Sequence, residues 1–212
     1  MLAIYTYFLS NSATYLKAVE QHIWVSLLSI LLAMIVGIPL GILSTKNKNL
    51  YKFITSVFNT LRIVPSLAIL VLCIPIMGTG VKPAITALVF LAIPPILINT
   101  ALAFKSIPDF ILETAAGMGM EESRIFFKVK IPLAMPYLLT GIKTATVEVI
   151  ASATLAAYIG AGGLGAIIFT GIGLFRSDLL FIGGASVAIL SILASALLSQ
   201  LERWLLRYQR VS

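Results

Sequence analysis

Charge is scarce in this 212-residue sequence. Only 11% of the residues are Asp, Glu, Lys or Arg, whereas 59% are hydrophobic. The mean hydropathy is +1.05. Soluble domains carry about 25% charged residues, because a surface in water needs them. So few charges exclude an ordinary soluble domain and indicate an integral membrane protein. At this length we expect a single domain over residues 1–212.

Residues that hold metals, form disulfides or perform catalysis are also scarce. Cys73 is the only cysteine, so no internal disulfide is possible, and its apolar neighbours favour a packing role. His22 is the only histidine, which excludes a multi-histidine metal site, and we find no Ser-His-Asp or Cys-His set. We expect His22 at the membrane interface. We expect no enzyme activity, metal or cofactor in this chain.

Nucleotide-binding motifs are missing or out of context. No GxxxxGK[ST] occurs, so we expect no ATP binding by a P-loop. Gly160, Gly162 and Gly165 match GxGxxG, but that fingerprint needs a preceding strand. These glycines instead predict a sharp bend and close packing. The net charge of +7 comes from scattered residues that form no single patch, so we expect no nucleic-acid partner.

Long apolar stretches are abundant. Five are long enough to cross a membrane: Ile23–Leu43, Phe53–Met77, Ala84–Phe104, Leu133–Tyr158 and Leu179–Leu201. The second holds Asn59, Arg62 and Pro65, so we expect its crossing to begin as an amphipathic turn. We expect Pro94-Pro95 to interrupt the third. The glycine-rich residues 159–178 are too broken to cross. The predicted fold is all-α with about five transmembrane helices.

Small residues predict two close helix contacts. Gly37 and Gly41 form a GxxxG pair in the first stretch. The last stretch has small residues at four-residue spacing, which predict a smooth packing face: Gly184, Ala188, Ser191, Ser195 and Ser199. Residues 1–21 lack a basic start and a cleavage site, so we expect them to remain attached.

The Lys and Arg residues predict the orientation. Ten of the 15 lie in the first loop, in residues 105–132 or in the tail, on one side of a five-span topology. The other side has Lys17, Lys82 and Arg176. Because cytoplasmic loops carry the excess of Lys and Arg, we expect the N-terminus outside and the C-terminus in the cytoplasm.

The polar segment Lys105–Pro132 reads KSIPDFILETAAGMGMEESRIFFKVKIP. Pro108 predicts a helix start, and Gly117 and Gly119 predict a bend. A second short helix should open at Glu121 and Glu122, where a helix N-terminus favours negative charge, with Glu121 paired to Arg124. We expect Pro132 to end this second helix and so to close the segment.

This segment resembles the cytoplasmic loop of the membrane subunit of bacterial ABC importers. Six residues fall at the spacing of that family's pattern: Glu113, Ala115, Gly119, Val129, Ile131 and Pro132. Thr114 departs from the usual Ala. The flanking stretches resemble the permeases for glycine betaine, carnitine and choline, among them IPLGILSTK, VPSLAIL, IPIMGTGVKPAI and ATLAAYIGAGGLG.

The resemblance implies a type I ABC importer permease fold in the bacterial cytoplasmic membrane. Residues 105–132 would be the coupling helix that docks on an ATPase subunit, through Glu113, Thr114, Ala115, Ala116, Gly119, Met120, Glu121, Glu122, Arg124 and Pro132. The implied partners are two ABC ATPase subunits that bind ATP and Mg²⁺, a second permease copy or paralogue, an external substrate-binding protein and lipid.

Polar residues inside the stretches are candidates for a translocation path. Thr140, Thr144 and Glu148 share one helix face, which Ser152 continues. A charge inside a span costs a few kcal/mol and often marks a pathway. A carboxylate there would suit a cation such as choline. The alternative is a structural ion pair of Glu148 with Arg62 or Lys143. The other candidates are Arg62, Pro65, Ser66, Asn99, Thr100 and Lys143.

Several readings remain open from the sequence. Within transport, the main alternative is an ABC permease for methionine or another amino acid. A membrane scaffold without a pathway is the alternative from another class. A secondary transporter would need coupling-ion carboxylates and internal repeats, which we do not find. The particular osmoprotectant, the identity of the second permease, and whether the binding protein is separate or fused to another subunit remain open.

Overall fold

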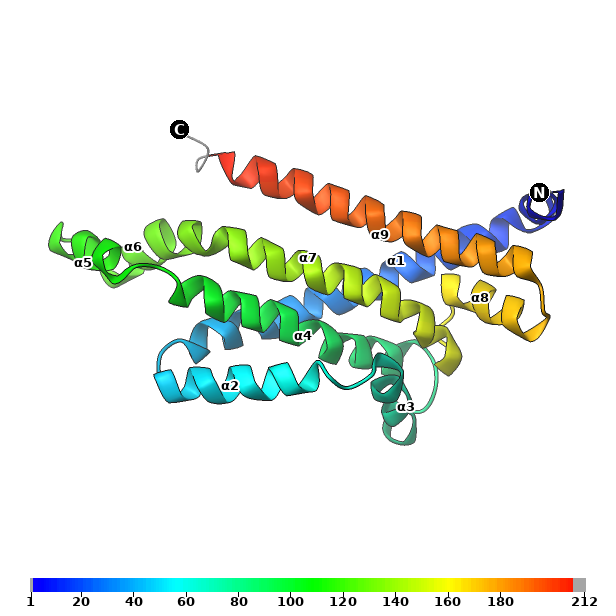
Figure 1. Cartoon of the computed structure of the whole chain (residues 1–212), viewed down its shortest axis with the longest axis horizontal. Coiled ribbons are helices and arrows are strands. Elements are labelled where there is room, and N and C mark those ends of the chain that lie inside the picture. Colours follow the sequence, from blue (N-terminus) through cyan, green and yellow to red (C-terminus); the bar gives the residue numbers. More distant parts are fainter. Residues whose placement is uncertain (1, 208–212) are drawn as a thin grey trace.

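The computed structural model describes residues 2–207, and all regular structure in that range is helical (Figure 1). The α-helices are α1 (Leu2–Ser44), α2 (Lys48–Leu61), α3 (Ser66–Met77), α4 (Val81–Lys105), α5 (Asp109–Gly117), α6 (Glu122–Ile125), α7 (Ile131–Ala156), α8 (Leu164–Gly173) and α9 (Ser177–Leu205). A π-helix, Phe126–Lys130, joins α6 to α7, and a 3-10 helix, Ala157–Ile159, follows α7.

Each of the five predicted apolar stretches is helical in the structure. Four helices are long and apolar enough to cross a membrane, and the bent pair α2–α3 is the fifth if counted as one span. In Figure 1 the loop that contains α5 and α6 lies at the same end of the bundle as the end of α9, and the start of α1 lies at the opposite end. An odd number of crossings requires this arrangement. The all-α membrane fold is therefore confirmed.

The first helix is much longer than the predicted apolar stretch. α1 begins at Leu2 and is kinked at Asn11, whose φ of −129° and ψ of 19° are not helical. Hydropathy located the part that could cross a membrane and missed the polar turns before it. Side chains of those turns, among them Ile4, Tyr15 and Val19, pack against buried residues of α8 and α9, and this packing stabilises the helix there.

The second span is broken in the middle. α2 and α3 meet at 92°, with the break between Leu61 and Ser66. Pro65 precedes α3 with φ −59° and ψ 135°, and a proline disfavours helical geometry in the residue before it. α2 is amphipathic, as predicted: Ile54 and Phe58 pack against the core, and Asn59 is exposed.

The predicted interruption of the third span is wrong. α4 runs without a break through Pro94 and Pro95, and both are buried. Pro94 and Pro95 have no N–H group to donate to the helix. The packing of α4 against α1 and α7 stabilises the helix in spite of these two missing donors. The Asn99 side-chain amide also donates to the Pro95 carbonyl at 2.8 Å.

The predicted helix end at Pro132 is also wrong. Residues Glu122–Ile159 form one continuous helical rod. In the π-helix the Ile131 N–H donates to Phe126, five residues back. This change of register falls just before Pro132, whose nitrogen has no hydrogen to donate. The loop helix α6 is therefore joined rigidly to the membrane helix α7.

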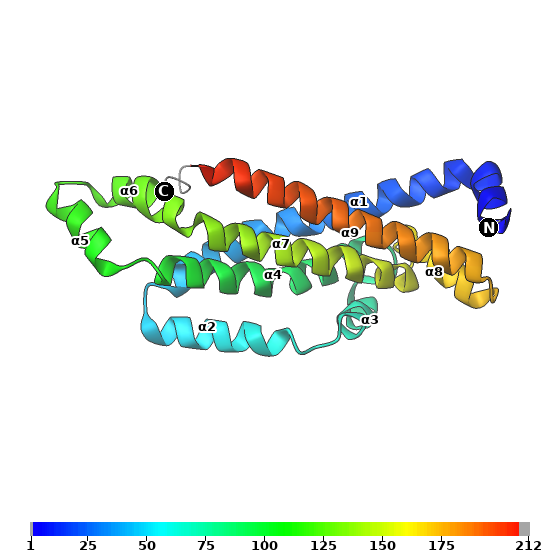
Figure 2. The ribbon, with the colours of Figure 1, turned by 45° about the horizontal axis from the view of Figure 1, so that its top comes forward.

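α4 packs against both α1 and α7, and it lies between α7 and α2 in Figure 2. Glycines allow these helices to approach closely. A Cβ atom on Gly41 would lie 2.6 Å from Cβ of Thr100, and one on Gly141 would lie 2.7 Å from Cβ of Asn99. A Cβ on Gly37 would lie 3.0 Å from the Ile96 side chain. The close contact predicted for the GxxxG pair is confirmed.

The glycine-rich segment after α7 is a bend, as predicted. Gly160, Gly162 and Gly163 have φ values of 84°, 73° and 73°, which residues with a side chain rarely adopt. Gln21 of α1 holds this bend by donating to the Ala161 carbonyl at 2.7 Å and accepting from the Gly163 N–H at 3.2 Å. α8 follows and, at 10 residues, is too short to cross.

His22, which we expected at the membrane interface, is enclosed by protein. Its side chain is buried, and Nε2 lies 3.1 Å from the Ile150 carbonyl oxygen of α7. The glycine bend covers it, with Gly163 in contact with the imidazole. The residues next to His22 in the sequence did not indicate that the glycine bend would cover it.

The predicted small-residue face of α9 is only partly correct. Gly184 and Ala188 are exposed, and nothing lies within 4 Å of a Cβ placed on Gly184. The close contact is made by Gly183, where a Cβ would lie 2.5 Å from Ile168 of α8. Ser191, Ser195 and Ser199 are half-buried.

Candidate functional site

The loop between α4 and α7 has a defined bend. The Gly119 N–H donates to Ala116 at 2.9 Å, and the Met120 N–H donates to Ala115 at 3.2 Å. This pair of bonds is the Schellman arrangement that ends a helix with a left-handed residue. Gly119 supplies that residue, with φ 80°. Of the two glycines predicted to break the helix, Gly119 makes the turn, and Gly117 is still helical.

The loop is anchored at both ends. The rings of Phe104 and Phe126 stack with centroids 5.8 Å apart, which ties the end of α4 to the start of the π-helix. Lys105 Nζ lies 3.8 Å from the centroid of the Tyr51 ring on α2. Ala115 and Ile125 are buried between the two short helices. The loop is therefore attached to the end of α4, to α2 and to the π-helix.

The outer surface of the loop presents apolar and charged side chains together. Phe110 and Met118 are 67% and 72% exposed. Glu121 and Arg124 are both exposed, and the predicted ion pair between them is absent from the described residues. Glu121 is the N-cap of α6 with extended backbone, so the helical three-residue spacing does not apply to it.

The remaining coupling candidates lie on the same loop. Glu113, Thr114, Ala116 and Glu122 are exposed, and Met120 and Pro132 are half-buried. The Thr114 hydroxyl donates to the Phe110 carbonyl at 2.7 Å, so this departure from the family's Ala is accommodated within α5. An exposed surface of this composition is typical of a protein-interaction site.

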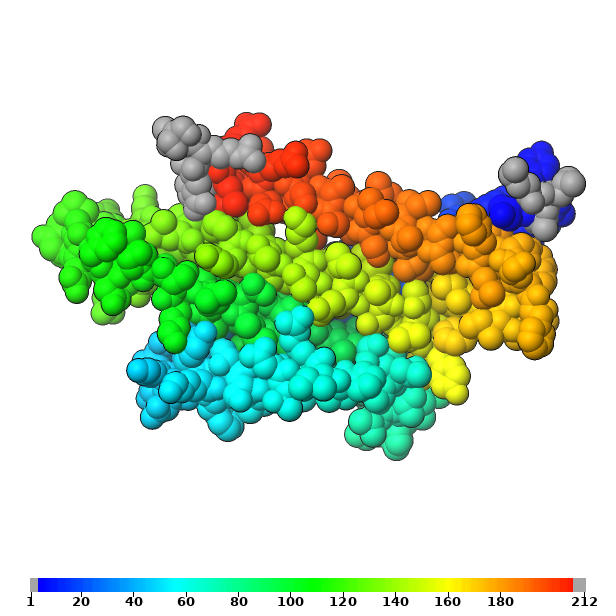
Figure 3. Space-filling model, viewed as in Figure 1, coloured from blue at the N-terminus to red at the C-terminus, as the bar shows by residue number. Residues whose placement is uncertain are grey.

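A second feature, which we call the central cavity, lies where α2 and α3 meet. Its volume is about 620 Å³, which is in the usual range for small-molecule sites. Figure 3 shows the α2–α3 pair lying alongside α7, with α4 between them. The lining residues are Leu61, Arg62, Ile63, Val64, Pro65, Ser66, Ile69, Leu72, Phe90, Leu91, Pro94, Glu148, Ala151 and Ser152.

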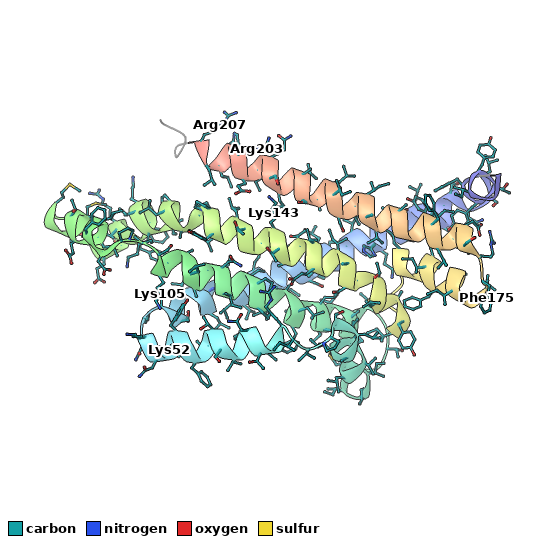
Figure 4. The ribbon with its side chains drawn as sticks, viewed as in Figure 1. Lys52, Lys105, Lys143, Phe175, Arg203 and Arg207 are labelled. Atoms are coloured by element: carbon teal, nitrogen blue, oxygen red, sulfur yellow. The ribbon has the colours of Figure 1, made fainter. Side chains whose placement is uncertain are left out.

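An ion pair spans the central cavity. Arg62 Nη2 lies 3.1 Å from Glu148 Oε1, and the two side chains are 41% and 39% exposed. Glu148 therefore both lines the cavity and pairs with Arg62. Lys143, the other possible partner, pairs instead with Glu202 of α9 at 3.5 Å (Figure 4). Charges this exposed in the middle of a span need water or a protein partner rather than lipid.

The central cavity brings together half of the predicted path residues: Arg62, Pro65, Ser66, Glu148 and Ser152. Thr140 and Thr144 lie on the same face of α7 but nearer the loop, and their hydroxyls donate to carbonyls one turn back. Asn99 lies against Gly141, and Thr100 is fully buried against Gly41. These two residues pack helices together and do not line the cavity.

Sequence reasoning missed the contribution of α4 to the cavity. Phe90, Leu91 and Pro94 form part of its wall. The available signal was the one-turn spacing of Phe90 and Pro94, which places both on one helix face.

The fold is that of ABC transporter membrane subunits. The fold matches a chain of the inward-facing MetNI methionine ABC transporter with a TM-score of 0.80 at 25% identity, covering 90% of this chain and 95% of that one. Residues 37–208 match the family described as binding-protein-dependent transport system inner membrane component. The chain belongs to this family and is a multi-pass permease subunit, not an enzyme.

Two of the similar proteins are permeases named for the solutes that they transport. The chain is 41% identical to the carnitine transport permease protein OpuCB of Listeria monocytogenes, covering 95% of this chain and 93% of the relative. It is 37% identical to the glycine betaine/carnitine/choline transport system permease protein OpuCB of Bacillus subtilis (strain 168), covering 93% and 91%.

Proposed function

We propose that this chain is the permease subunit of a binding-protein-dependent ABC importer for quaternary-ammonium osmoprotectants: glycine betaine, carnitine and choline. The observation that carries the proposal is the nearly full-length match to permeases named for these solutes. The carboxylate of Glu148 in a cavity of suitable size supports it, because a quaternary ammonium is a permanent cation.

We infer that the α5–α6 loop and the C-terminus face the cytoplasm and that the N-terminus faces outside. The distribution of basic residues supports this orientation. Lys52, Lys105, Arg203 and Arg207 all lie toward the end of the bundle that carries the loop, whereas Phe175 marks the opposite end (Figure 4).

We further infer that the loop docks on an ABC ATPase, with two such subunits per transporter. ATP and Mg²⁺ would be bound by the ATPases and no cofactor by this chain. The exposed Phe110 and Met118 would enter a groove, and Glu121, Glu122 and Arg124 would supply charged contacts around them. The rigid joint of α6 to α7 supports a lever that transmits closure of the ATPases to the spans.

The central cavity is our candidate for part of the translocation path. The half-exposed Arg62–Glu148 pair supports this assignment, because a second permease, either a copy or a paralogue, would shield it from lipid. An external binding protein would deliver the solute to the opposite end from the loop. Rocking of the helices would then expose the cavity to each side in turn.

Uptake of radiolabelled carnitine, choline and glycine betaine tests the proposal. The host strain should lack its own carriers and express the chain with its partner subunits. We expect uptake of at least one of these solutes and copurification of a P-loop ATPase. Uptake of methionine instead would favour an amino-acid permease, and copurification of no ATPase would favour a scaffold.

A further inference from the structure

We propose that Arg62, Glu148 and Phe90 form a transient site in the central cavity for zwitterions with a quaternary ammonium at one end and a carboxylate at the other. The proposal rests on the proposed function and adds the charge pattern that the path prefers. Glycine betaine and carnitine have this pattern, whereas choline is a cation without a carboxylate.

The cavity has the composition that such a ligand needs. Its wall is apolar apart from the charged pair and the hydroxyl groups of Ser66 and Ser152. Pockets of this kind use a few polar groups in an apolar wall to orient a small ligand. Arg62 and Glu148 are both half-exposed, so a ligand in the cavity can reach either one.

The wall formed by α4 favours the ammonium end. The Phe90 side chain is 58% exposed and lines the cavity, and the face of an aromatic ring attracts an ammonium ion. Pro94 and Pro95 have no N–H, so the carbonyls of Phe90 and Leu91 lack the donor that a helix normally supplies four residues on. Carbonyl dipoles of this kind attract cations.

The ion pair favours a zwitterion over a bare cation. Arg62 and Glu148 neutralise each other across 3.1 Å. A cation that bound Glu148 would leave the guanidinium without its partner inside a span, which is the costly arrangement. A zwitterion offers its carboxylate to Arg62 and its ammonium to Glu148. Arg62 and Glu148 then each keep a partner of opposite charge while the ion pair between them is broken.

The same helix carries a matched control. Lys143 of α7 and Glu202 of α9 form an ion pair of 3.5 Å with 32% and 28% exposure. Neither residue lines the central cavity. The two pairs have the same charges and similar exposure, and they differ in whether a solute in the cavity can reach them.

The test compares uptake of choline and glycine betaine by the complete transporter. Arg62→Gln leaves the carboxylate unopposed and removes the partner of the betaine carboxylate, so the choline-to-betaine ratio should rise about tenfold. Glu148→Gln leaves the guanidinium unopposed, which repels choline while betaine keeps its carboxylate contact. The ratio should then fall about tenfold.

Opposite shifts distinguish a solute site from a structural ion pair, because loss of a structural pair would lower both uptakes in both variants. Lys143→Gln and Glu202→Gln should leave the ratio unchanged. A ratio that does not move, or that moves the same way in both cavity variants, overturns the proposal. Failure of the wild-type transporter to carry any of the three osmoprotectants would instead overturn the proposed function.

Zwitterionic lipid headgroups share this chemistry, so the uptake should be repeated in vesicles of phosphatidylglycerol. Shifts that persist there exclude a lipid as the occupant, and shifts that vanish assign the site to a lipid headgroup and overturn the proposal.

A labelling experiment tests the site without the binding protein. Ser152→Cys, combined with Cys73→Ser, places one thiol in the cavity wall. Millimolar glycine betaine should slow its reaction with a water-soluble maleimide several-fold, and choline should slow it less. Adding Arg62→Gln should abolish the protection by glycine betaine. Equal protection by both solutes, or protection by neither, overturns the proposal.

Discussion

Replacing Gly119 with alanine should weaken docking on the ATPase, and the structure gives the size of the effect. Gly119 has φ 80°, and nothing lies within 4 Å of a Cβ placed on it, so the change is purely conformational. A side chain in left-handed geometry costs about 1 to 2 kcal/mol. The loop of the variant relaxes when free and must be bent again to dock, so affinity should fall by about 5- to 30-fold.

Gly117 provides the control. Like Gly119, it has open space where a Cβ would lie. It is two residues before Gly119 in the sequence, but its backbone is helical. Gly117→Ala should leave affinity unchanged or raise it slightly, because alanine stabilises a helix by about 1 kcal/mol relative to glycine.

The assay is a titration of the solubilised permease with the purified ATPase, followed by transport in vesicles. Equal affinities for Gly119→Ala and the wild type would refute the reasoning, as would equal weakening by the two alanine variants. In the first case the bend would not be part of the docked conformation. In the second, any added methyl group on this surface would be harmful, whatever the backbone geometry.

Three further predictions concern packing, orientation and coupling. Gly41→Ala should destabilise the bundle by about 1 to 3 kcal/mol and lower its Tm in detergent, whereas Gly184→Ala should not; equal Tm values would contradict the tight packing. In a Cys73→Ser background, Met118→Cys should react with an impermeant thiol reagent only when the reagent is on the cytoplasmic side. Phe175→Cys should react only when the reagent is outside. The reverse pattern would show that the orientation is opposite to the one inferred. Deleting Leu133, in the first turn of α7, should rotate the loop by about 100° relative to the rest of α7 and abolish ATP-driven uptake by an assembled complex; normal uptake would show that this register is unimportant.

Local sequence was sufficient for the features that depend on one residue or one spacing. The bend at Gly119 needs a left-handed residue, and the helix α5 needs the restricted backbone of Pro108 at its start. The pair Gly37 and Gly41 indicated close packing without naming the partner, which proved to be α4.

The prolines show where local reasoning failed. Pro65 lies in the break before α3, whereas Pro94, Pro95 and Pro132 lie in continuous helices. The difference comes from neighbours. Packing on both sides stabilises α4 through two missing donors, and a π turn adjusts the register before Pro132. No property of the proline itself distinguishes these cases.

Long-range partners were equally hidden. From the sequence, either Arg62 or Lys143 could form an ion pair with Glu148. In the structure the partner is Arg62, which the bend between α2 and α3 places next to Glu148. His22 was expected at an interface and is buried, because the glycine bend folds over it. Phe90 drew no attention in the sequence, and its position on the cavity wall depends on the path of three other helices.

The sequence by itself determined that this chain is a membrane-embedded helical permease with several apolar helices and a structured polar loop. These features depend on short segments of the chain. Hydropathy acts through the transfer of apolar side chains from water, and the positions of proline and glycine and the loop spacing act through backbone geometry. The tertiary structure alone decided which charges meet, which residues enclose the cavity and how the loop is joined to α7. These outcomes depend on how whole helices pack against one another, and no short segment contains that information.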